Sequence, residues 1–191
     1  GGFGIKAGSM GGYSPYLQWA GRVFMALFGV NFSVYYLLLM RKVGLAVRDE
    51  EVRLYFLILL ASGALIAWDI RDLTPDVSDR IRHAYFQVSS IMTTTGFSTV
   101  DFDAWPAFSK SILLCLMAVG ACAGSTGGGL KVIRLSIMVK SLRRAVRRTL
   151  RPNSVQLVRV NGKVLGDDVL HNVSAYLVAY VLIAFGSFMI V

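Results

Sequence analysis

The chain alternates between long apolar runs and short polar segments, and the length of each run predicts how it meets a membrane. Residues 16–40 form one run, interrupted by only four polar residues, and residues 54–68 and 169–191 form two others. A transmembrane helix needs about 20 apolar residues. We therefore expect the first and last runs to span a bilayer, and the second to span it once its flanks extend the helix.

A shorter amphiphilic segment, residues 78–91, is too short to cross a bilayer and leads into residues 92–99, which read MTTTGFST. We call residues 92–99 the threonine run. Asp76 or Ser78 is suited to cap the helix that this segment would form. We expect a half-helix that enters the membrane from one face, stops at the threonine run and directs the negative end of its dipole at it.

A glycine-rich interruption divides the next apolar helix, which we expect to begin near Ala107. Residues 112–123 are strongly apolar, four glycines occur among residues 124–129, and a helical pattern resumes at residues 130–139. A glycine in a helix interior costs about 1 kcal/mol relative to alanine. The helix should therefore break at residues 124–129, which we call the glycine loop.

Composition indicates that these segments belong to an integral membrane protein. Hydrophobic residues make up 55% of the chain, charged residues make up 16%, and the mean hydropathy is +0.59. An ordinary globular domain is less apolar and carries more charge. The chain starts without Met and stops inside an apolar run, so we expect it to be a segment of a longer protein. Cys115 and Cys122 would lie about 10 Å apart along one helix, too far for a disulfide.

The distribution of the 20 Lys and Arg residues predicts the orientation in the membrane. Four of them lie between residues 41 and 53 and ten between residues 131 and 163, which leaves six on the side of the threonine run. Loops rich in Lys and Arg usually stay on the cytoplasmic side. Trp19, Trp68 and Trp105 would then lie near the opposite interface as an aromatic belt, and the threonine run would enter from outside.

The threonine run has the chemistry of a cation filter if it lies at membrane depth. Threonine favours extended backbone, and Gly96 permits the φ values that point successive carbonyl groups in one direction. Backbone carbonyls replace the hydration shell of a cation in such filters. Inside a membrane they are tolerated only where they face protein, a wet cavity or an ion. A polar turn after a surface helix is the alternative interpretation of such a run.

Residues 51–139 form one unit, made of a spanning helix, a half-helix, the threonine run and a broken helix. The start of the chain is similar to the later part of such a unit. Residues 1–4 (GGFG) stand before the first spanning helix and are similar to residues 95–98 (TGFS), so that Gly2 matches Gly96. Duplicated units imply a pore with internal pseudosymmetry. We expect the end of one repeat, a complete repeat, and a linker with the first helix of the next, in residues 1–49, 50–150 and 151–191.

Residues 93–99 (TTTGFST), together with residues 120–131 (GACAGSTGGGLK), resemble the third repeat of the TrkH/KtrB superfamily of potassium uptake proteins. The TrkH branch is the closer likeness, over essentially the whole chain. The resemblance implies an all-α integral membrane fold, in which four repeats of helix, pore loop and helix surround one ion path. Each repeat would carry a filter glycine, and a glycine-rich gating loop would interrupt the second helix of the third repeat. This chain would run from the second filter through the first helix of the fourth repeat.

By position, the resemblance implies a filter and a gate. The ion-binding carbonyls would come from Thr94, Thr95, Gly96, Phe97 and, in the preceding repeat, Gly2. The gating loop would consist of Gly124, Ser125, Thr126, Gly127, Gly128 and Gly129, with a helix kink that packs against a neighbour as the alternative. Lys131 and Arg134 would add charge near the gate, although ordinary positive-inside anchoring is the alternative for both. K+ would be the transported ion, with no other metal and no directly bound cofactor.

The resemblance also implies a homodimer in the bacterial cytoplasmic membrane, surrounded by lipid and gated by a cytoplasmic nucleotide-binding subunit of the TrkA type. The basic segment, residues 140–163, is the expected contact for that partner, and a lipid-headgroup surface is its alternative. The first-repeat filter residue that goes with potassium or sodium preference in this superfamily is absent. Sodium or unselective cation transport, and a non-conducting membrane scaffold or sensor, therefore stay open as alternative functions.

The sequence does not indicate an enzyme or a nucleic-acid-binding protein. Residues 124–131 resemble a phosphate-binding loop only superficially, because the required Gly-Lys-Ser/Thr ending is absent. His83 and His171 stand at helix starts beside polar residues, where we expect them to be solvated. The net charge of +9 lies mostly in membrane-flanking segments, where anionic lipid accounts for it.

Overall fold

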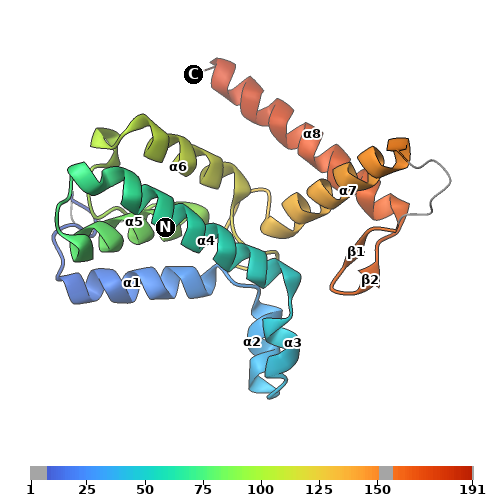
Figure 1. Cartoon of the computed structure of the whole chain (residues 1–191), viewed down its shortest axis with the longest axis horizontal. Coiled ribbons are helices and arrows are strands. Elements are labelled where there is room, and N and C mark those ends of the chain that lie inside the picture. Colours follow the sequence, from blue (N-terminus) through green and yellow to red (C-terminus); the bar gives the residue numbers. More distant parts are fainter. Residues whose placement is uncertain (1–7, 151–156, 191) are drawn as a thin grey trace. The chain divides into compact units, whose positions relative to one another are not determined.

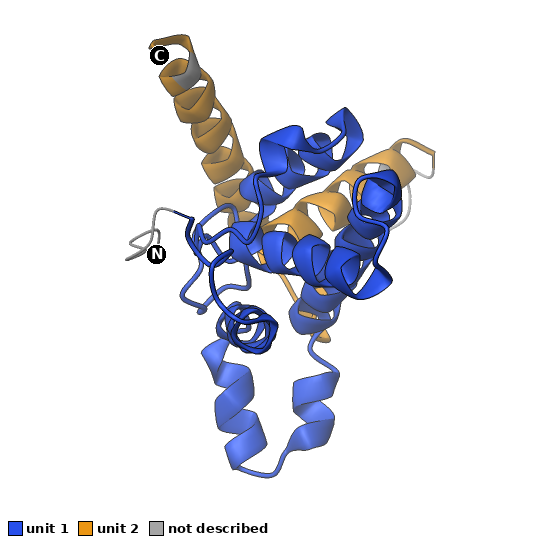
Figure 2. Cartoon of the chain, turned by 90° about the vertical axis from the view of Figure 1, so that its left-hand side faces the viewer, with its two compact units in different colours: residues 1–131 blue, residues 132–191 orange. Residues whose placement is uncertain are grey.

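A computed structural model describes residues 8–150 and 157–190. Gly2, the expected glycine of the preceding filter, lies outside the described residues. The described chain is mostly helical, with one short β-hairpin (Figure 1). It divides into two compact units, residues 1–131 and residues 132–191 (Figure 2).

The first unit contains six α-helices and two short 3-10 helices among its described residues. In chain order they are α1 (Pro15–Phe28), α2 (Phe32–Leu39), α3 (Val43–Val47), α4 (Glu50–Asp69), η1 (Ile70–Asp72), α5 (Val77–Met92), η2 (Phe102–Ala104) and α6 (Ala107–Val119). The second unit contains α7 (Val132–Leu150), β1 (Arg159–Val160), β2 (Lys163–Val164) and α8 (Asp167–Ile190).

The expected first spanning helix, residues 16–40, is divided into two helices. The axes of α1 and α2 differ in direction by 93°. Asn31 begins α2, because its side chain accepts the N–H of Ser33 at 2.9 Å as a helix cap. Gly29 lies so close to Tyr55 that a Cβ would sit 2.2 Å from the tyrosine hydroxyl oxygen. The prediction of one continuous helix is wrong. The run is apolar throughout, so its hydropathy does not reveal the cap at Asn31 or the close contact at Gly29 that divide it.

Two described helices are long and apolar enough to cross a membrane. They are α4 with its 3-10 extension, residues 50–72, and α8 over residues 167–187. The bent pair of α1 and α2 would be a third if its two parts form one span, and α6 is a shorter apolar helix. The expectation that flanking residues extend the run of residues 54–68 is confirmed, because α4 covers Glu50–Asp69.

α5 is the central helix of the first unit and packs against α1, α4 and α6. Asp76 caps its start, accepting the N–H of Ser78 at 3.2 Å. The last two turns are buried, with Phe86, Val88 and Met92 all at 0% exposure. Neighbouring helices therefore surround the half-helix that the sequence predicts, and its C-terminal end sets where the threonine run begins.

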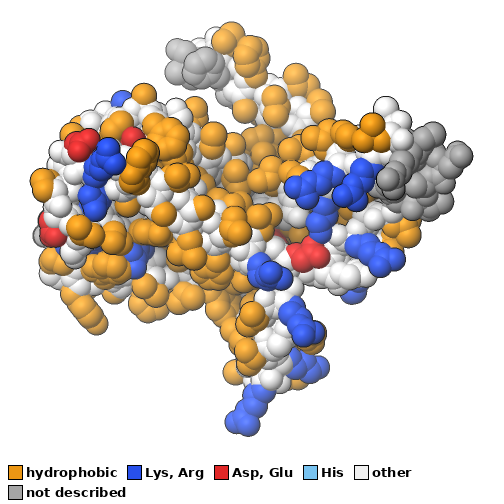
Figure 3. Space-filling model, viewed as in Figure 1, with side chains coloured by type: hydrophobic (Ala, Val, Ile, Leu, Met, Phe, Trp, Pro, Cys, Tyr) orange, Lys and Arg blue, Asp and Glu red, His pale blue; other side chains and the backbone are white. Residues whose placement is uncertain are grey.

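The second unit is a pair of helices joined through a hairpin. Its core consists of Ile137, Val158 and Leu170. The turn of the hairpin, Asn161-Gly162, has φ values of 50° and 77°, the left-handed pair that favours Asn-Gly in two-residue turns. Figure 3 shows Lys and Arg side chains gathered on α7 and on the α2 and α3 segment. Mostly hydrophobic atoms cover the other helices of the first unit in that view.

Candidate functional site

The threonine run begins where α5 ends, and the sign of φ alternates along its first residues. Thr93 has a φ of −90°, Thr94 one of 56° and Gly96 one of 82°, whereas the φ of Thr95 is not positive. Such alternation turns successive peptide groups the same way, with N–H groups on one side and carbonyls on the other. Gly96 occupies a region that favours glycine. Thr94 occupies it too, which is rare for a β-branched residue.

Three successive carbonyl oxygens of this run, those of Thr94, Thr95 and Gly96, accept no hydrogen bond from any residue that the structure describes. The N–H groups of Thr95 and Gly96 point instead at the carbonyl of Ser90, at 2.8 and 3.5 Å. The carbonyl of Phe97 differs, because it accepts the hydroxyl of Ser90 at 2.5 Å. The carbonyl of Thr93 likewise has no donor among the described residues, so four successive open oxygens precede that of Phe97, which already has one protein donor.

The far end of the threonine run is bonded to the segment that precedes α1. Ser98 donates its N–H to Ser9 Oγ at 3.1 Å and accepts the N–H of Met10 at 2.9 Å. Gln18, which is 4% exposed, donates from Nε2 to the carbonyls of Met10 and Tyr13, at 3.0 and 3.2 Å. The backbone that enters α1 and the backbone that leaves α5 are thus held side by side.

His83 contributes a further bond to the end of the run. Its Nδ1 lies 2.8 Å from the hydroxyl oxygen of Thr99. Burial, and then the neighbouring Arg82 guanidinium, lower the pKa of His83, while Asp79 raises it by a smaller amount. The imidazole is half-buried rather than solvated as expected, because the fold brings Thr99 back to the second turn of α5.

The glycine loop lies within a longer connection, residues 120–131, which we call the α6–α7 loop. α6 ends at Val119, before the glycine loop is reached. Gly120 and Gly129 have φ values of 72° and 81°, and a Cβ on Gly129 would lie 2.8 Å from the Cα of Gly120. The N–H of Leu130 then donates to the carbonyl of Ala118 at 3.2 Å. The loop closes on the end of α6 through a neck that only glycine fits.

The glycine loop is in direct contact with the threonine run. Gly128 donates its N–H to Thr94 Oγ1 at 2.8 Å, across 34 residues of sequence. A Cβ on Gly127 would lie 2.6 Å from the Cβ of Ala121 and 3.3 Å from the carbonyl oxygen of Thr93. The missing side chains thus allow the loop backbone to approach the run. This geometry gives Thr94 a second role, as the acceptor that joins the two segments.

The same loop is also bonded to the break between α1 and α2. Cys122 donates its N–H to the carbonyl of Gly29 at 3.0 Å, and Gly124 accepts the N–H of Phe32 at 3.1 Å. Thr126 adds a longer hydroxyl contact, 3.3 Å, to the last carbonyl of α1. Cys122 therefore lies in a loop rather than in the expected helix, and both described cysteines, Cys115 and Cys122, are free.

Two charged side chains of the first unit contact the α6–α7 loop. Glu51, at the start of α4, accepts the N–H of Ala123 at 2.6 Å. Lys131 donates from Nζ to a carbonyl within the glycine loop. Arg134 belongs to the second unit, where its guanidinium lies 4.0 Å from the ring centre of Tyr176. Of the two expected gate charges, Lys131 contacts the loop directly, whereas Arg134 stacks on an aromatic ring of its own unit.

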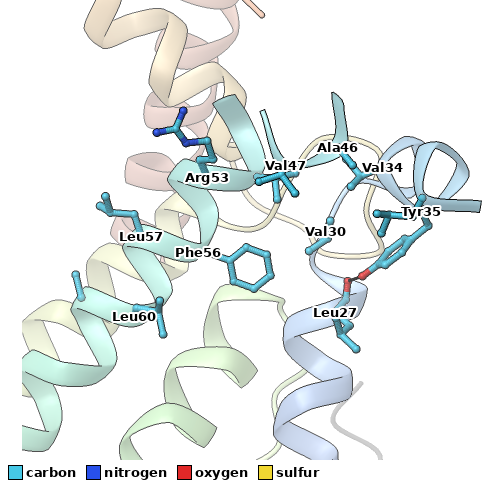
Figure 4. Close-up of a pocket in the computed structure, with 13 residues that line it drawn as sticks. Leu27, Val30, Val34, Tyr35, Ala46, Val47, Arg53, Phe56, Leu57 and Leu60 are labelled. Carbon is cyan, nitrogen blue, oxygen red and sulfur yellow. Dashed lines mark hydrogen bonds between the residues drawn. The ribbon is translucent and has the colours of Figure 1, made fainter. Parts of the chain in front are cut away.

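A cavity of about 490 Å³ lies beside the threonine run, lined by residues that include Thr93, Thr95, Phe97 and Thr126. The larger cavity, about 760 Å³, is elsewhere, between α4 and the α1 to α3 segment (Figure 4). Its lining is almost entirely apolar, with Arg53 the one charged side chain. The smaller cavity is mostly apolar as well, because Met10, Phe24, Met25, Phe28 and Phe86 line it beside the threonines. Among the described residues no group of three or more His, Cys, Asp or Glu could hold a metal.

Sequence reasoning missed three participants at this site, namely the Thr94 side chain, Glu51 and Gly29. The sequence points to Thr94 only through its backbone carbonyl and singles out neither Glu51 nor Gly29. One signal was available for Gly29, because a glycine followed shortly by Asn31 inside an apolar run marks a possible helix end. The partners of Thr94 and Glu51 are 34 and 72 residues away, so no local pattern reveals them.

Comparison with known proteins gives a consistent result. The family model of TrkH, described as a cation transport protein, matches residues 1–191. The Trk system potassium uptake proteins TrkH of Salmonella typhimurium and Escherichia coli K12 are each 34% identical over 188 residues. Each alignment covers 96% of this chain and 39% of the relative, so the chain spans about two fifths of their length.

The fold is similar to that of a solved structure, the potassium transporter TrkH from Vibrio parahaemolyticus. The TM-score is 0.87 at 31% sequence identity, and the match covers 95% of this chain and 40% of the other. The all-α membrane fold expected from the sequence is thus confirmed. Since the family model matches the chain over its entire length, the chain belongs to the TrkH family of cation transport proteins.

Proposed function

We propose that this chain is the part of a potassium-translocating membrane protein that contributes one selectivity filter and its gate. The observation that carries the proposal is the set of three successive carbonyl oxygens, those of Thr94, Thr95 and Gly96, that have no donor among the described residues and lie at the end of a buried half-helix. The names of the relatives, which are potassium uptake proteins, support the same function.

The chemistry follows from the cost of removing water from a cation. Carbonyl oxygens that point the same way replace water molecules around the ion, and the negative end of α5 favours a positive charge at this place. The carbonyl of Phe97 would bind the ion through its remaining lone pair, because Ser90 already donates to it. In the proposed pore Gly2 would supply the corresponding filter glycine of the preceding repeat, residues 1–49, and residues 50–150 would be the complete repeat.

The glycine loop would act as the gate of this pore. Its backbone lies against the threonine run through Gly128 and Thr94, and N–H groups that point into an ion path repel a cation. Lys131 would add positive charge close to the loop. We take this contact to be the closed arrangement, which opens when the loop moves away from the run.

By family, we further propose a homodimer in the bacterial cytoplasmic membrane that a nucleotide-binding subunit of the TrkA type regulates. The exposed basic side chains of α7, Arg143 and Arg147 among them, are the proposed contact for that subunit. Residues 151–191 would then be the linker and the first helix of the next repeat. The positive-inside rule supports a cytoplasmic position for α7.

Cation flux tests the proposal most directly. The full-length protein is placed in liposomes, and potassium and sodium uptake are compared for the wild type and for Gly96→Asp, whose carboxylate and strained φ should both block the filter. We expect potassium-preferring flux that the substitution abolishes. Gly166→Asp is the matched control, because nothing lies within 4 Å of a Cβ there. Equal sodium flux would indicate an unselective transporter, and absence of flux with partner and nucleotide supplied would favour a scaffold.

A further inference from the structure

The start of α4 carries a buried carboxylate that its own helix does not need. Glu51 is 4% exposed although its side chain is ionisable. The first N–H groups of α4 already have an acceptor, because Asp49 Oδ1 takes those of Glu51 and Val52 at 2.9 and 3.1 Å. Glu51 Oε1 instead accepts the N–H of Ala123 in the α6–α7 loop at 2.6 Å. Burying a carboxylate is costly unless it is well bonded, so this bond needs an explanation beyond helix capping.

The contact falls next to the gate. Ala123 directly precedes the glycine loop, and its neighbours Ala121 and Cys122 are both at 0% exposure. The bond is short, and an ionised acceptor makes a hydrogen bond roughly twice as strong as a neutral one. Glu51 therefore binds the loop between its buried residues, Ala121 and Cys122, and the start of the glycine loop at Gly124.

The same part of the loop is bonded to the other end of the α2 and α3 segment. Phe32, the first residue of α2, donates its N–H to Gly124 at 3.1 Å. Glu51 follows shortly after α3 and binds Ala123. The hairpin formed by α2 and α3, residues 32–47, is thus attached to the loop at its first residue, and α4, which follows the hairpin, is attached to the adjacent residue of the loop. Displacement of the hairpin relative to α4 must move Gly124 relative to Ala123 or break one of these two bonds.

From these contacts we propose that Glu51 is a positioning residue of the gate, and that through it and Phe32 the α2–α3 hairpin controls the position of the glycine loop. The inference rests on the proposed function, because it assumes that the glycine loop gates the ion path. It assigns to the hairpin a regulatory role that its sequence does not indicate. The exposed far end of the hairpin, at Arg41 and Lys42, is where a displacing force would act.

The chain contains a reporter for this proposal in Cys122. Its thiol is fully buried beside Ala123, so its rate of reaction with a membrane-permeant maleimide measures how often the loop leaves its place. The experiment uses the full-length protein in liposomes. Cys115→Ser removes the exposed thiol, and any thiols outside this chain are also replaced by serine. This background protein is compared with two variants. Glu51→Gln keeps the shape and an acceptor without the charge, and Glu51→Leu removes both.

We expect maleimide labelling of Cys122 to be about 3-fold faster in Glu51→Gln and about 10-fold faster in Glu51→Leu, as loss of part or all of a charged hydrogen bond implies. Potassium flux through the same liposomes should rise in the same order. Asp72→Asn, in the 3-10 helix η1 that follows α4 and with its side chain 89% exposed, is the control and should change neither rate.

Two results would overturn the proposal. One is unchanged labelling in both Glu51 variants. The other is faster labelling with unaltered flux, which would make Glu51 a structural residue only. A variant that fails to fold would lose its sharp thermal unfolding transition. If Glu51→Leu fails in this way, the labelling and flux of Glu51→Gln, which replaces only one carboxylate oxygen by an amide group, test the proposal. If the wild type carries no ion, the proposed function fails, while the labelling rates still report whether Glu51 holds the loop.

Discussion

The bond between Gly128 and Thr94 offers a sharp test of how the gate is held closed. Thr94→Val keeps the size and the branched shape of the side chain but removes the hydroxyl oxygen that accepts the Gly128 N–H at 2.8 Å. Both residues are exposed, so the freed N–H finds water and no burial penalty is added. The change should therefore cost the closed arrangement only the net value of one hydrogen bond, about 1 kcal/mol.

That magnitude fixes the expected result. If the bond exists only in the closed arrangement, about 1 kcal/mol corresponds to roughly a fivefold shift of the equilibrium toward the open one. Potassium flux through full-length protein in liposomes should rise by that factor wherever opening limits the rate. The substitution adds no new backbone strain at φ 56°, because valine and threonine are both β-branched.

Thr94→Ser is the matched control, since it keeps the hydroxyl and loses only the methyl group. We expect its flux to stay near the wild-type value. Equal rises in Thr94→Val and Thr94→Ser would refute the reasoning, because the methyl group and not the hydrogen bond would then govern the gate. A fall in flux in Thr94→Val alone would show that the hydroxyl serves the conducting filter instead.

Two further predictions concern stability. Gly29→Ala should lower the free energy of unfolding by about 1–3 kcal/mol through overpacking, because the new Cβ would lie 2.2 Å from the Tyr55 hydroxyl oxygen. Thermal unfolding in detergent measures this loss. Gly44→Ala is the control and should cause no loss, because nothing lies within 4 Å of a Cβ there. Asp69→Ala should cost about 1–3 kcal/mol, because Asp69 Oδ2 accepts both the N–H and the hydroxyl of Ser109, at 3.1 and 2.6 Å. An unchanged melting temperature in either variant would contradict the contact concerned.

Much of the local structure could be predicted from the sequence, because it depends on neighbouring residues. The half-helix begins at its Asp76 cap and ends at the threonine run, as capping preference and the change of pattern indicate. The apolar length of α4 and α8 follows from the same hydropathy that marks a membrane helix. The break of the helix after α6 was predicted too, although Gly120 ends α6 before the glycine loop begins.

What only the tertiary structure decided are the contacts between segments that are distant in sequence. The bend at Gly29 depends on Tyr55, the second role of Thr94 depends on Gly128, and the buried position of Glu51 depends on Ala123. No periodicity or propensity carries such information, since each bond forms only after the helices have packed. The sequence by itself determined most of the helical segments and where the chain is glycine-rich, but neither the break between α1 and α2 nor the end of α6 at Val119. Packing around α5 determined that the glycine loop, the helix break and the threonine run meet at one place.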